Sequence, residues 1–259
     1  AQTLARVGQQ VERWYDRAQN VVSTETVRIQ PLGSDLTPTG FARRLTFELR
    51  VGWDPSRTGP GGLPVASVLR EPVGENGRSA REREEARCMD PKPVSPEPLE
   101  MLLPARLGES EFSAAGTARV DGRPALRIDY RGRAAEPAEI TWTDACVSVA
   151  LPGRSRGRIW VDAETYDVLR LDDRLAGSFE FDVPREHVRI GAARSMVIER
   201  AESSIRYKSV EFQDPNETLL LPASVDTLTV IGGGSTQRVR ITQRFSDYRR
   251  FLTDSRLVP

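Results

Sequence analysis

The chain has 259 residues, with 37 basic and 37 acidic side chains, a formal charge of zero and a pI near 6.9. Its composition, 38% hydrophobic and 29% charged, is typical of a globular protein long enough to bury a substantial core. The sequence contains no run of about 18 apolar residues and therefore predicts no membrane-spanning helix. The balanced charge argues against nucleic acid as a partner, because phosphate binding usually requires a basic excess.

Residues 3–20 give the strongest helix prediction. Their apolar side chains recur three or four positions apart, which places them on one stripe of a helix. Asn20 is a plausible end signal. A strand is predicted next, over 24–31, with Val27 and Ile29 on one side. The helical stripe consists of Leu4, Val7, Val11, Trp14, Tyr15 and Ala18.

The segment 40–53 has large apolar side chains at nearly every second position, which is the period of an extended strand. One face carries Phe41, Leu45, Phe47, Leu49, Val51 and Trp53. Arg43 is the only interruption in this apolar register. A strand so long and one-sided is typical of an antiparallel sheet that curls around apolar material, which is either core or ligand.

The rest of the chain alternates loops with short strands. A loop rich in Gly and Pro over 54–64 precedes a strand at 65–71. The segment 72–98 is the least regular region, and a helical turn is predicted after it, at 98–103. From residue 110 onward strands follow at short intervals, as in an antiparallel meander. These strands are predicted at 112–120, 123–130, 139–142, 146–151, 157–162, 167–171, 178–183, 195–201, 204–212, 222–231 and 237–244.

These elements predict one α+β domain over residues 1–259. We expect a strongly curved antiparallel β-sheet, or half-open β-barrel, of about ten strands with the N-terminal amphipathic helix packed on it. No internal repeat or long linker divides the chain.

The segment 157–171, GRIWVDAETYDVLRL, matches the pattern G-R-I/L-W-V/I-D-x-x-T-x-x-V/P-x-R. It resembles the strand-turn-strand unit of the LolA/LolB/RseB-like superfamily of periplasmic lipoprotein carriers and sensors. The hairpin 116–130 resembles the preceding repeat of that sheet, and Leu221-Pro222 with 239–251 is similar to its closing strands. The resemblance implies a half-open antiparallel barrel with helices plugging its concave face, often around an apolar cavity for acyl chains. Compared with the compact carriers, 72–98 and 144–157 look like irregular elaborations.

The chain begins Ala1-Gln2, as a mature protein does after signal-peptide removal at a small-residue site. We therefore expect a periplasmic or otherwise extracytoplasmic location. In such a compartment Cys88 and Cys146 could form one disulfide, which would contribute about 4 kcal/mol by constraining the unfolded chain. The alternative is two unrelated buried thiols.

The basic residues are almost all arginine, since only Lys92 and Lys208 are lysines. One interpretation is bidentate recognition of anions. The other is a GC-rich genome that replaces Lys codons by Arg codons. The even spread of arginine along the chain, together with its richness in Ala, Gly and Pro, favours the second interpretation.

Enzymatic machinery is sparse. Any Ser-His-Asp or Cys-His arrangement would need the single histidine, His187, which lies in a turn-like polar stretch. Two distant cysteines give no zinc pattern, and the acidic residues of 214–217 are better explained as a polar turn than as a calcium site. The glycine-rich segments 59–62 and 232–234 match no nucleotide-binding motif. We therefore expect no catalytic residues, no metal and no cofactor.

The apolar residues of 40–53 are the candidate site together with two further tryptophans. They either line a cavity that receives an acyl chain or fill the barrel as core. Arg43 would mark the cavity mouth, or the point where the strand leaves the core. The candidate ligand-binding set is Phe41, Leu45, Phe47, Leu49, Val51, Trp53, Trp142 and Trp160.

Two functions are compatible with this site, and a third alternative, an unrecognised hydrolase, would need a pocket with convergent ionisable groups. The first is a non-enzymatic carrier or sensor that binds a lipid or lipoprotein on an apolar concave face. The second is a structural or accessory subunit of a cell-envelope complex that uses the same fold to bind a protein. In both cases the chain would be peripheral to the membrane at most.

Overall fold

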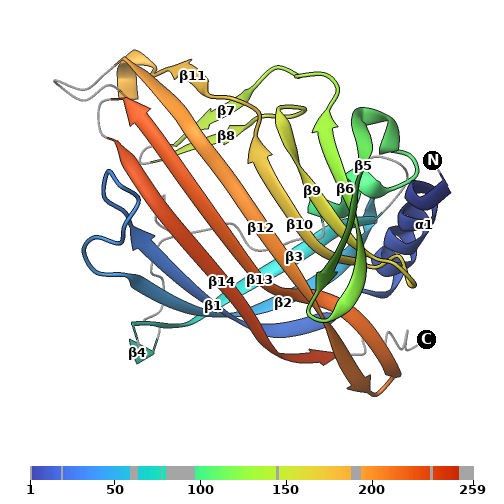
Figure 1. Cartoon of the computed structure of the whole chain (residues 1–259). Helices are drawn as coiled ribbons and strands as arrows, with labels where there is room; N and C mark the ends of the chain where they lie inside the picture. The colour runs from blue at the N-terminus through green and yellow to red at the C-terminus, as the bar shows by residue number, and fades with distance from the viewer. Residues whose placement is uncertain are drawn as a thin grey trace.

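The computed structural model of the chain describes residues 2–18, 20–58, 64–76, 78–79, 97–143, 146–187, 194–233 and 236–250. These residues form the helix α1 (Gln2–Arg17), fourteen β-strands and short 3-10 helices (Figure 1). The strands are β1 (Val21–Pro31), β2 (Arg43–Thr58), β3 (Pro64–Glu75), β4 (Arg78–Ser79), β5 (Ser110–Val120), β6 (Arg123–Gly132), β7 (Glu139–Trp142), β8 (Val147–Ala150), β9 (Ser155–Asp162), β10 (Val168–Leu175), β11 (Phe179–Asp182), β12 (Ser195–Gln213), β13 (Asn216–Gly233) and β14 (Gln237–Arg250). The 3-10 helices are η2 (Glu97–Leu102), η3 (Leu107–Glu109) and η4 (Arg185–His187).

Twelve of the described strands form one antiparallel sheet in the order β4-β3-β2-β1-β14-β13-β12-β10-β9-β6-β5, with β11 paired to β12 off this path. The strands β7 and β8 form a separate two-stranded sheet. The sheet is open, because its end strands β4 and β5 do not pair with each other. The strand β1 lies between β2 and β14, and Val21 of β1 pairs with Arg250 of β14, so that the two ends of the chain belong to one sheet.

The apolar stripe predicted for the N-terminal helix is confirmed. Val7, Val11 and Tyr15 of α1 are buried in the main core. They pack in one cluster with Leu99 and Leu102 of η2. We call the face of the sheet that α1 and η2 cover the inner face, and the opposite face the outer face.

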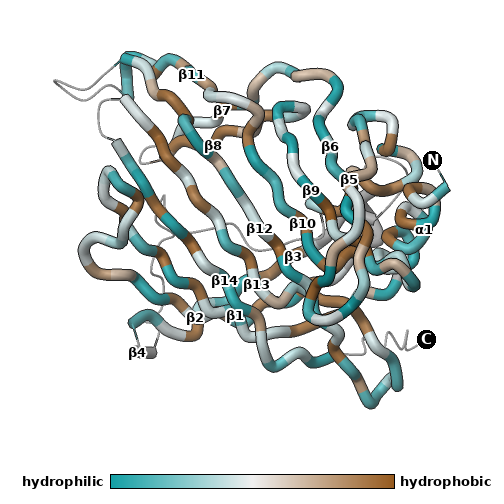
Figure 2. Tube along the Cα trace, viewed as in Figure 1, coloured by the Kyte–Doolittle hydropathy of each residue, from teal (hydrophilic) through white to brown (hydrophobic). Residues whose placement is uncertain are grey.

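The main core joins strands that lie far apart in the sheet order. Leu49 of β2 and Ile128 of β6 belong to the same buried cluster as α1. In Figure 1, β3 runs at a large angle to β9, β10 and β12. Along the strands apolar and polar residues alternate, as Figure 2 shows for β13 and β14. This alternation follows from the two-residue period of a strand with one buried face.

The α+β class and the antiparallel meander are confirmed, while several strand limits differ from the prediction. The strand predicted at 40–53 begins only at Arg43, because the chain turns through Gly40 at a positive φ of 62° and Phe41 follows in irregular structure. The strands predicted at 195–201 and 204–212 are the single strand β12. The polar pair Ser203-Ser204 does not interrupt it, since β10 and β13 hold it on both sides.

The regions expected to be irregular are described only in part. Residues 77 and 80–96, which include Cys88, and residues 144–145 lie outside the described residues, as does Phe251. The described parts include the end of β3, the strand β8 and the first residues of β9. Among the described residues, no helix has the length and apolar character needed to cross a membrane.

Candidate functional site

A recess of about 720 Å³ on the inner face lies between the 3-10 helices and the strands β6, β9, β10 and β12. Leu171 of β10 and Ile205 of β12, both members of the main core, form its apolar floor. Pro98 and Met101 of η2 line the opposite side. The volume falls within the range of about 300–1,000 Å³ that is usual for pockets that bind small molecules.

A small polar group interrupts this apolar floor. The hydroxyl of Tyr130 donates a hydrogen bond to Oδ1 of Asp173. Burial raises the pKa of Asp173 above its ordinary value, and hydrogen bonds from Tyr130 and Ser155 offset part of that effect. Burial likewise raises the pKa of Tyr130, so its hydroxyl keeps its proton and acts as a donor. Such a group can fix the polar end of a mainly apolar ligand.

Gly157 gives Tyr130 its place in the recess. A Cβ atom at this position would lie 1.9 Å from the backbone oxygen of Asp172 and 2.8 Å from the Tyr130 ring. Only glycine leaves room for the ring to approach the backbone of β9 so closely.

An ion-pair cluster fixes the 3-10 helices at the recess mouth. The guanidinium of Arg106 contacts Glu100 of η2 and bonds Glu109 of η3, with 2.9 Å between Nη2 and Oε2. These bonds, above all the one that Arg106 donates to Glu109, raise the pKa of Arg106, and the group stays charged. The cluster ties η2 to η3 and thereby shapes the wall of the recess.

A second inner-face cavity lies beneath α1, and it is nearly filled. Its volume is about 40 Å³, and Trp14, Leu49 and Tyr207 are among the side chains that line it. The helix is fixed over it by hydrogen bonds from Trp14 Nε1 to the Leu220 oxygen and from Gln10 to Asp167, both 2.6 Å long. An acyl chain would enter here only if α1 moved away.

The apolar residues predicted on one face of β2 divide between two clusters. Leu49 is buried in the main core, and Val51 packs against it beside the cavity under α1. Leu45 is buried, with Phe47 packed beside it, in a separate cluster that includes Ile29 of β1. All four therefore lie on the inner face.

The remaining predicted site residues lie elsewhere. Phe41 is fully exposed and precedes β2. Trp142 belongs to the small β7–β8 sheet and stacks on His187, with ring centroids 4.9 Å apart. Trp160 lies on the outer face, since its neighbours Ile159 and Val161 point into the core. The side chain of Trp53 lies outside the described residues.

Arg43, expected at a cavity mouth, is bound at the edge of the inner face. Its Nε lies 2.5 Å from Oε1 of Glu75 in β3. The predicted Cys88–Cys146 disulfide stays a prediction, since Cys88 lies outside the described residues. The roles predicted for Arg43, at a cavity mouth, and for the two cysteines, as a disulfide, therefore remain untested.

Sequence reasoning missed the polar groups of the inner face. Glu25 of β1 is completely buried and forms two bonds with Arg70 of β3, at 2.7 and 2.8 Å. Asp173 of the recess stands two residues after Leu171 and two before Leu175. This break in the apolar register of β10 was the available signal for an inward polar group.

The chain matches no family model and no curated protein. Among solved structures it is similar to a DUF1329 family protein from Desulfovibrio piger, with 10% identity, a TM-score of 0.43, and coverage of 98% of this chain and 95% of that one. It is similar to a LolA superfamily protein from Nitrosomonas europaea, with 8% identity, a TM-score of 0.39, and coverage of 98% and 96%. A putative outer membrane lipoprotein-sorting protein domain from Vibrio parahaemolyticus matches with 8% identity, a TM-score of 0.41, and coverage of 97% and 94%.

LolA superfamily and lipoprotein-sorting structures are thus among the proteins that this chain is similar to, as its sequence motifs predicted. All three TM-scores lie below 0.5, so these likenesses carry no argument about function.

Proposed function

We propose that the chain is a non-enzymatic, periplasmic carrier or sensor that binds the acyl chain of a lipid or lipoprotein. The ligand would lie on the inner face of a strongly curved, half-open sheet formed by a single domain. The observation that carries the proposal is the recess of about 720 Å³ beside η2 and η3. Its floor is continuous with the main core, so a ligand there would bury apolar surface.

The polar groups of the recess support the same assignment. Tyr130 and Asp173, with Ser155 and Ser203 beside them, offer one hydrogen-bonding region next to the apolar floor, which suits a ligand with a carboxyl, ester or amide at one end. A longer chain would reach the region beneath α1, where Leu49 and Val51 lie. That extension requires α1 to move from its present place.

Binding of a fluorescent fatty acid, 11-(dansylamino)undecanoic acid, tests the proposal. The delipidated protein is expected to enhance its emission, and oleic acid should displace it. A Gly108→Trp variant should weaken binding at least tenfold, because Gly108 lines the recess and a Cβ there meets no atom within 4 Å.

Gly52→Trp is the matched control, since Gly52 lies on the outer face of β2 with its nearest neighbour 4.0 Å from an added Cβ. This variant should bind as the wild type does. Absence of any fatty-acid binding, or equal weakening in both variants with unchanged melting temperatures, would contradict the proposal.

A protein-binding accessory subunit is the second candidate, and the open edge of the sheet favours it. The strand β5 has eleven residues and pairs with β6 on one side only among the described strands. Such an edge can accept a strand from a partner. Native mass spectrometry of protein purified from its own source separates the two candidates, because a retained lipid supports the carrier and a retained protein supports the accessory subunit.

A further inference from the structure

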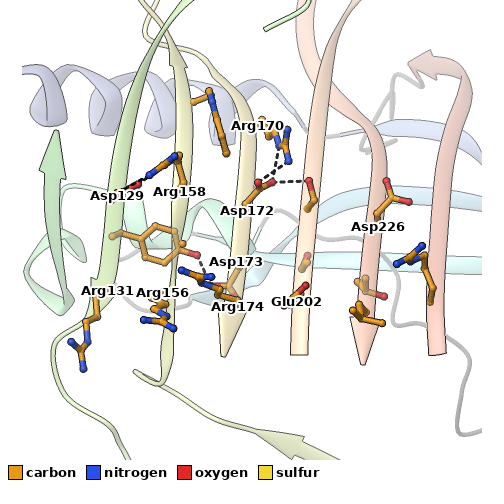
Figure 3. Close-up of a pocket in the computed structure, with 18 residues that line it drawn as sticks. Asp129, Arg131, Arg156, Arg158, Arg170, Asp172, Asp173, Arg174, Glu202 and Asp226 are labelled. Atoms are coloured by element: carbon orange, nitrogen blue, oxygen red, sulfur yellow. Dashed lines mark hydrogen bonds and ion pairs between the residues drawn. The ribbon is translucent and has the colours of Figure 1, made fainter. Parts of the chain in front are cut away.

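The outer face carries a groove of about 650 Å³ that lies across β6, β9, β10, β12, β13 and β14. Figure 3 shows it from the side opposite α1, with charged side chains in rows that cross the strands. This groove is separated from the inner-face recess by the sheet itself, and the lipid-binding proposal does not use it.

One row consists of three arginines on adjacent strands. Arg131 of β6 is paired in register with Arg156 of β9, and Arg156 with Arg174 of β10. All three are exposed, and none forms an ion pair with another described residue. Side chains directly opposite each other on antiparallel strands have Cβ atoms about 4.5–5.5 Å apart, so like charges in these positions repel and destabilise the sheet.

Two glutamates flank this row. Glu111 of β5, which is exposed, pairs with Arg131 in register but forms no ion pair with a described residue. At the other end of the row, Glu202 of β12 pairs with Arg174 in register. Its carboxylate is bound by Arg200 of its own strand, with 2.7 Å between Nη2 and Oε1. The row therefore keeps an excess of positive charge at one end of the groove (Figure 3).

The adjacent row, two residues along the same strands, is balanced. Arg158 forms two bonds with Asp129, at 2.5 and 3.0 Å, and Ser204 donates a bond of 2.7 Å to Asp172. Arg170 also binds Asp172 through two bonds of 2.7 Å. A genome rich in arginine codons explains why the cations are arginines. It does not explain why the arginines of this row are hydrogen-bonded to carboxylates, while the three arginines of the other row lie side by side and form no ion pair with a described residue.

We propose that Arg131, Arg156 and Arg174 bind a phosphate group with two negative charges, as found in a phosphomonoester or a pyrophosphate. Three guanidinium groups that approach from adjacent strands can each direct two N–H donors at one tetrahedral anion, which matches the bidentate geometry of arginine–phosphate contacts. An acidic peptide fits less well. Extended along a strand, it would bring its next carboxylate toward Asp129 or Asp172, about 6.8 Å away.

Isothermal titration of the full chain with inorganic pyrophosphate at low ionic strength tests this site. The wild type is expected to bind, with affinity falling as salt rises. The triple variant Arg131→Gln, Arg156→Gln, Arg174→Gln should bind at least tenfold more weakly. The substituted side chains are exposed, so the fold should persist, and the melting temperature should stay the same or rise as the repulsion is removed.

The matched control removes the same charge elsewhere, by Arg13→Gln, Arg44→Gln and Arg244→Gln on α1, β2 and β14. It should keep the wild-type affinity within about twofold, the expected size of a non-specific charge effect. Equal weakening of pyrophosphate binding in the two triple variants would overturn the proposal. So would a wild type that binds neither pyrophosphate nor phosphatidic acid vesicles.

Vesicle flotation identifies the source of the phosphate group. Binding to phosphatidic acid vesicles, which display a phosphomonoester, but not to phosphatidylglycerol vesicles, which display a phosphodiester, indicates a lipid headgroup, provided that the arginine triple variant loses it. Pyrophosphate binding without vesicle binding indicates a soluble ligand. Vesicle binding that the arginine triple variant retains would contradict the site.

Discussion

Glu25 and Arg70 form a two-bond ion pair on the inner face, with the Glu25 side chain completely buried and the Arg70 side chain 12% exposed. Gln243 donates a third bond of 2.8 Å to the same carboxylate. The guanidinium of Arg70 also stacks on Phe47, 3.8 Å from its ring centroid. The pair joins β1, β3 and β14, which includes the strands nearest both ends of the chain.

Removing one partner of this pair should destabilise the protein strongly. Arg70→Met leaves the Glu25 carboxylate buried without its cation, so we expect urea unfolding to show a loss of about 3–5 kcal/mol. Glu202→Gln in the exposed pair with Arg200 should change stability by less than about 1 kcal/mol. Equal effects of the two substitutions would show that the inner-face pair contributes no more than a surface contact.

Asp173 should make the stability of the protein fall as pH rises above about 4. Burial raises its pKa in the folded state above the unfolded value near 3.8, so the folded state holds the proton over a pH window in which the unfolded state has lost it. In that window stability decreases with pH. In Asp173→Asn this contribution is absent, and the amide oxygen still accepts the Tyr130 hydrogen bond. In urea unfolding from pH 3 to pH 7, the free energy of unfolding of the variant should increase relative to that of the wild type as pH rises. The opposite trend would contradict the raised pKa of Asp173.

Position 157 should tolerate no side chain, because Gly157 lies against the ring of Tyr130. Gly157→Ala places a methyl group 1.9 Å from the Asp172 oxygen, so β9 or β10 must shift. We expect a loss of about 3 kcal/mol or more in unfolding free energy. Gly52→Ala is the control, because its added atom meets nothing closer than 4.0 Å. A neutral Gly157→Ala would show that the Tyr130 ring does not need this close approach.

If Cys88 and Cys146 form the predicted disulfide, two effects should be measurable. The native protein should show no free thiol by labelling and mass spectrometry, and reduction should lower its stability by about 4 kcal/mol. A Cys88→Ser, Cys146→Ser variant should match the reduced protein. Two free thiols in protein exported through its own pathway would favour the alternative of unrelated cysteines.

The sequence was sufficient to predict those elements whose signal lies within one short segment. The helical stripe of Val7, Val11 and Tyr15 and the strand alternation of Leu45, Phe47 and Leu49 depend only on periodicity, and both are found. The extent of β12 was wrong because a polar pair breaks a local pattern but not a strand held by two neighbours.

The recess and the arginine row could not be predicted, because both depend on strand register. Tyr130 meets Asp173 across a distance of 43 residues in sequence. Arg131, Arg156 and Arg174 become neighbours only when β6, β9 and β10 pair as they do. The sequence alone placed Trp160 with the candidate apolar site, whereas the observed register places it on the outer face.

Affinity as a function of acyl-chain length tests the central claim most directly. If the chain lies in the inner-face recess, each added methylene should contribute roughly 0.8 kcal/mol, or about fourfold in Kd, until the recess of about 720 Å³ is filled. A displacement series from octanoic to hexadecanoic acid should therefore show steadily tighter binding in the wild type and a flat response in Gly108→Trp. Affinity that does not change with chain length in the wild type would contradict the account.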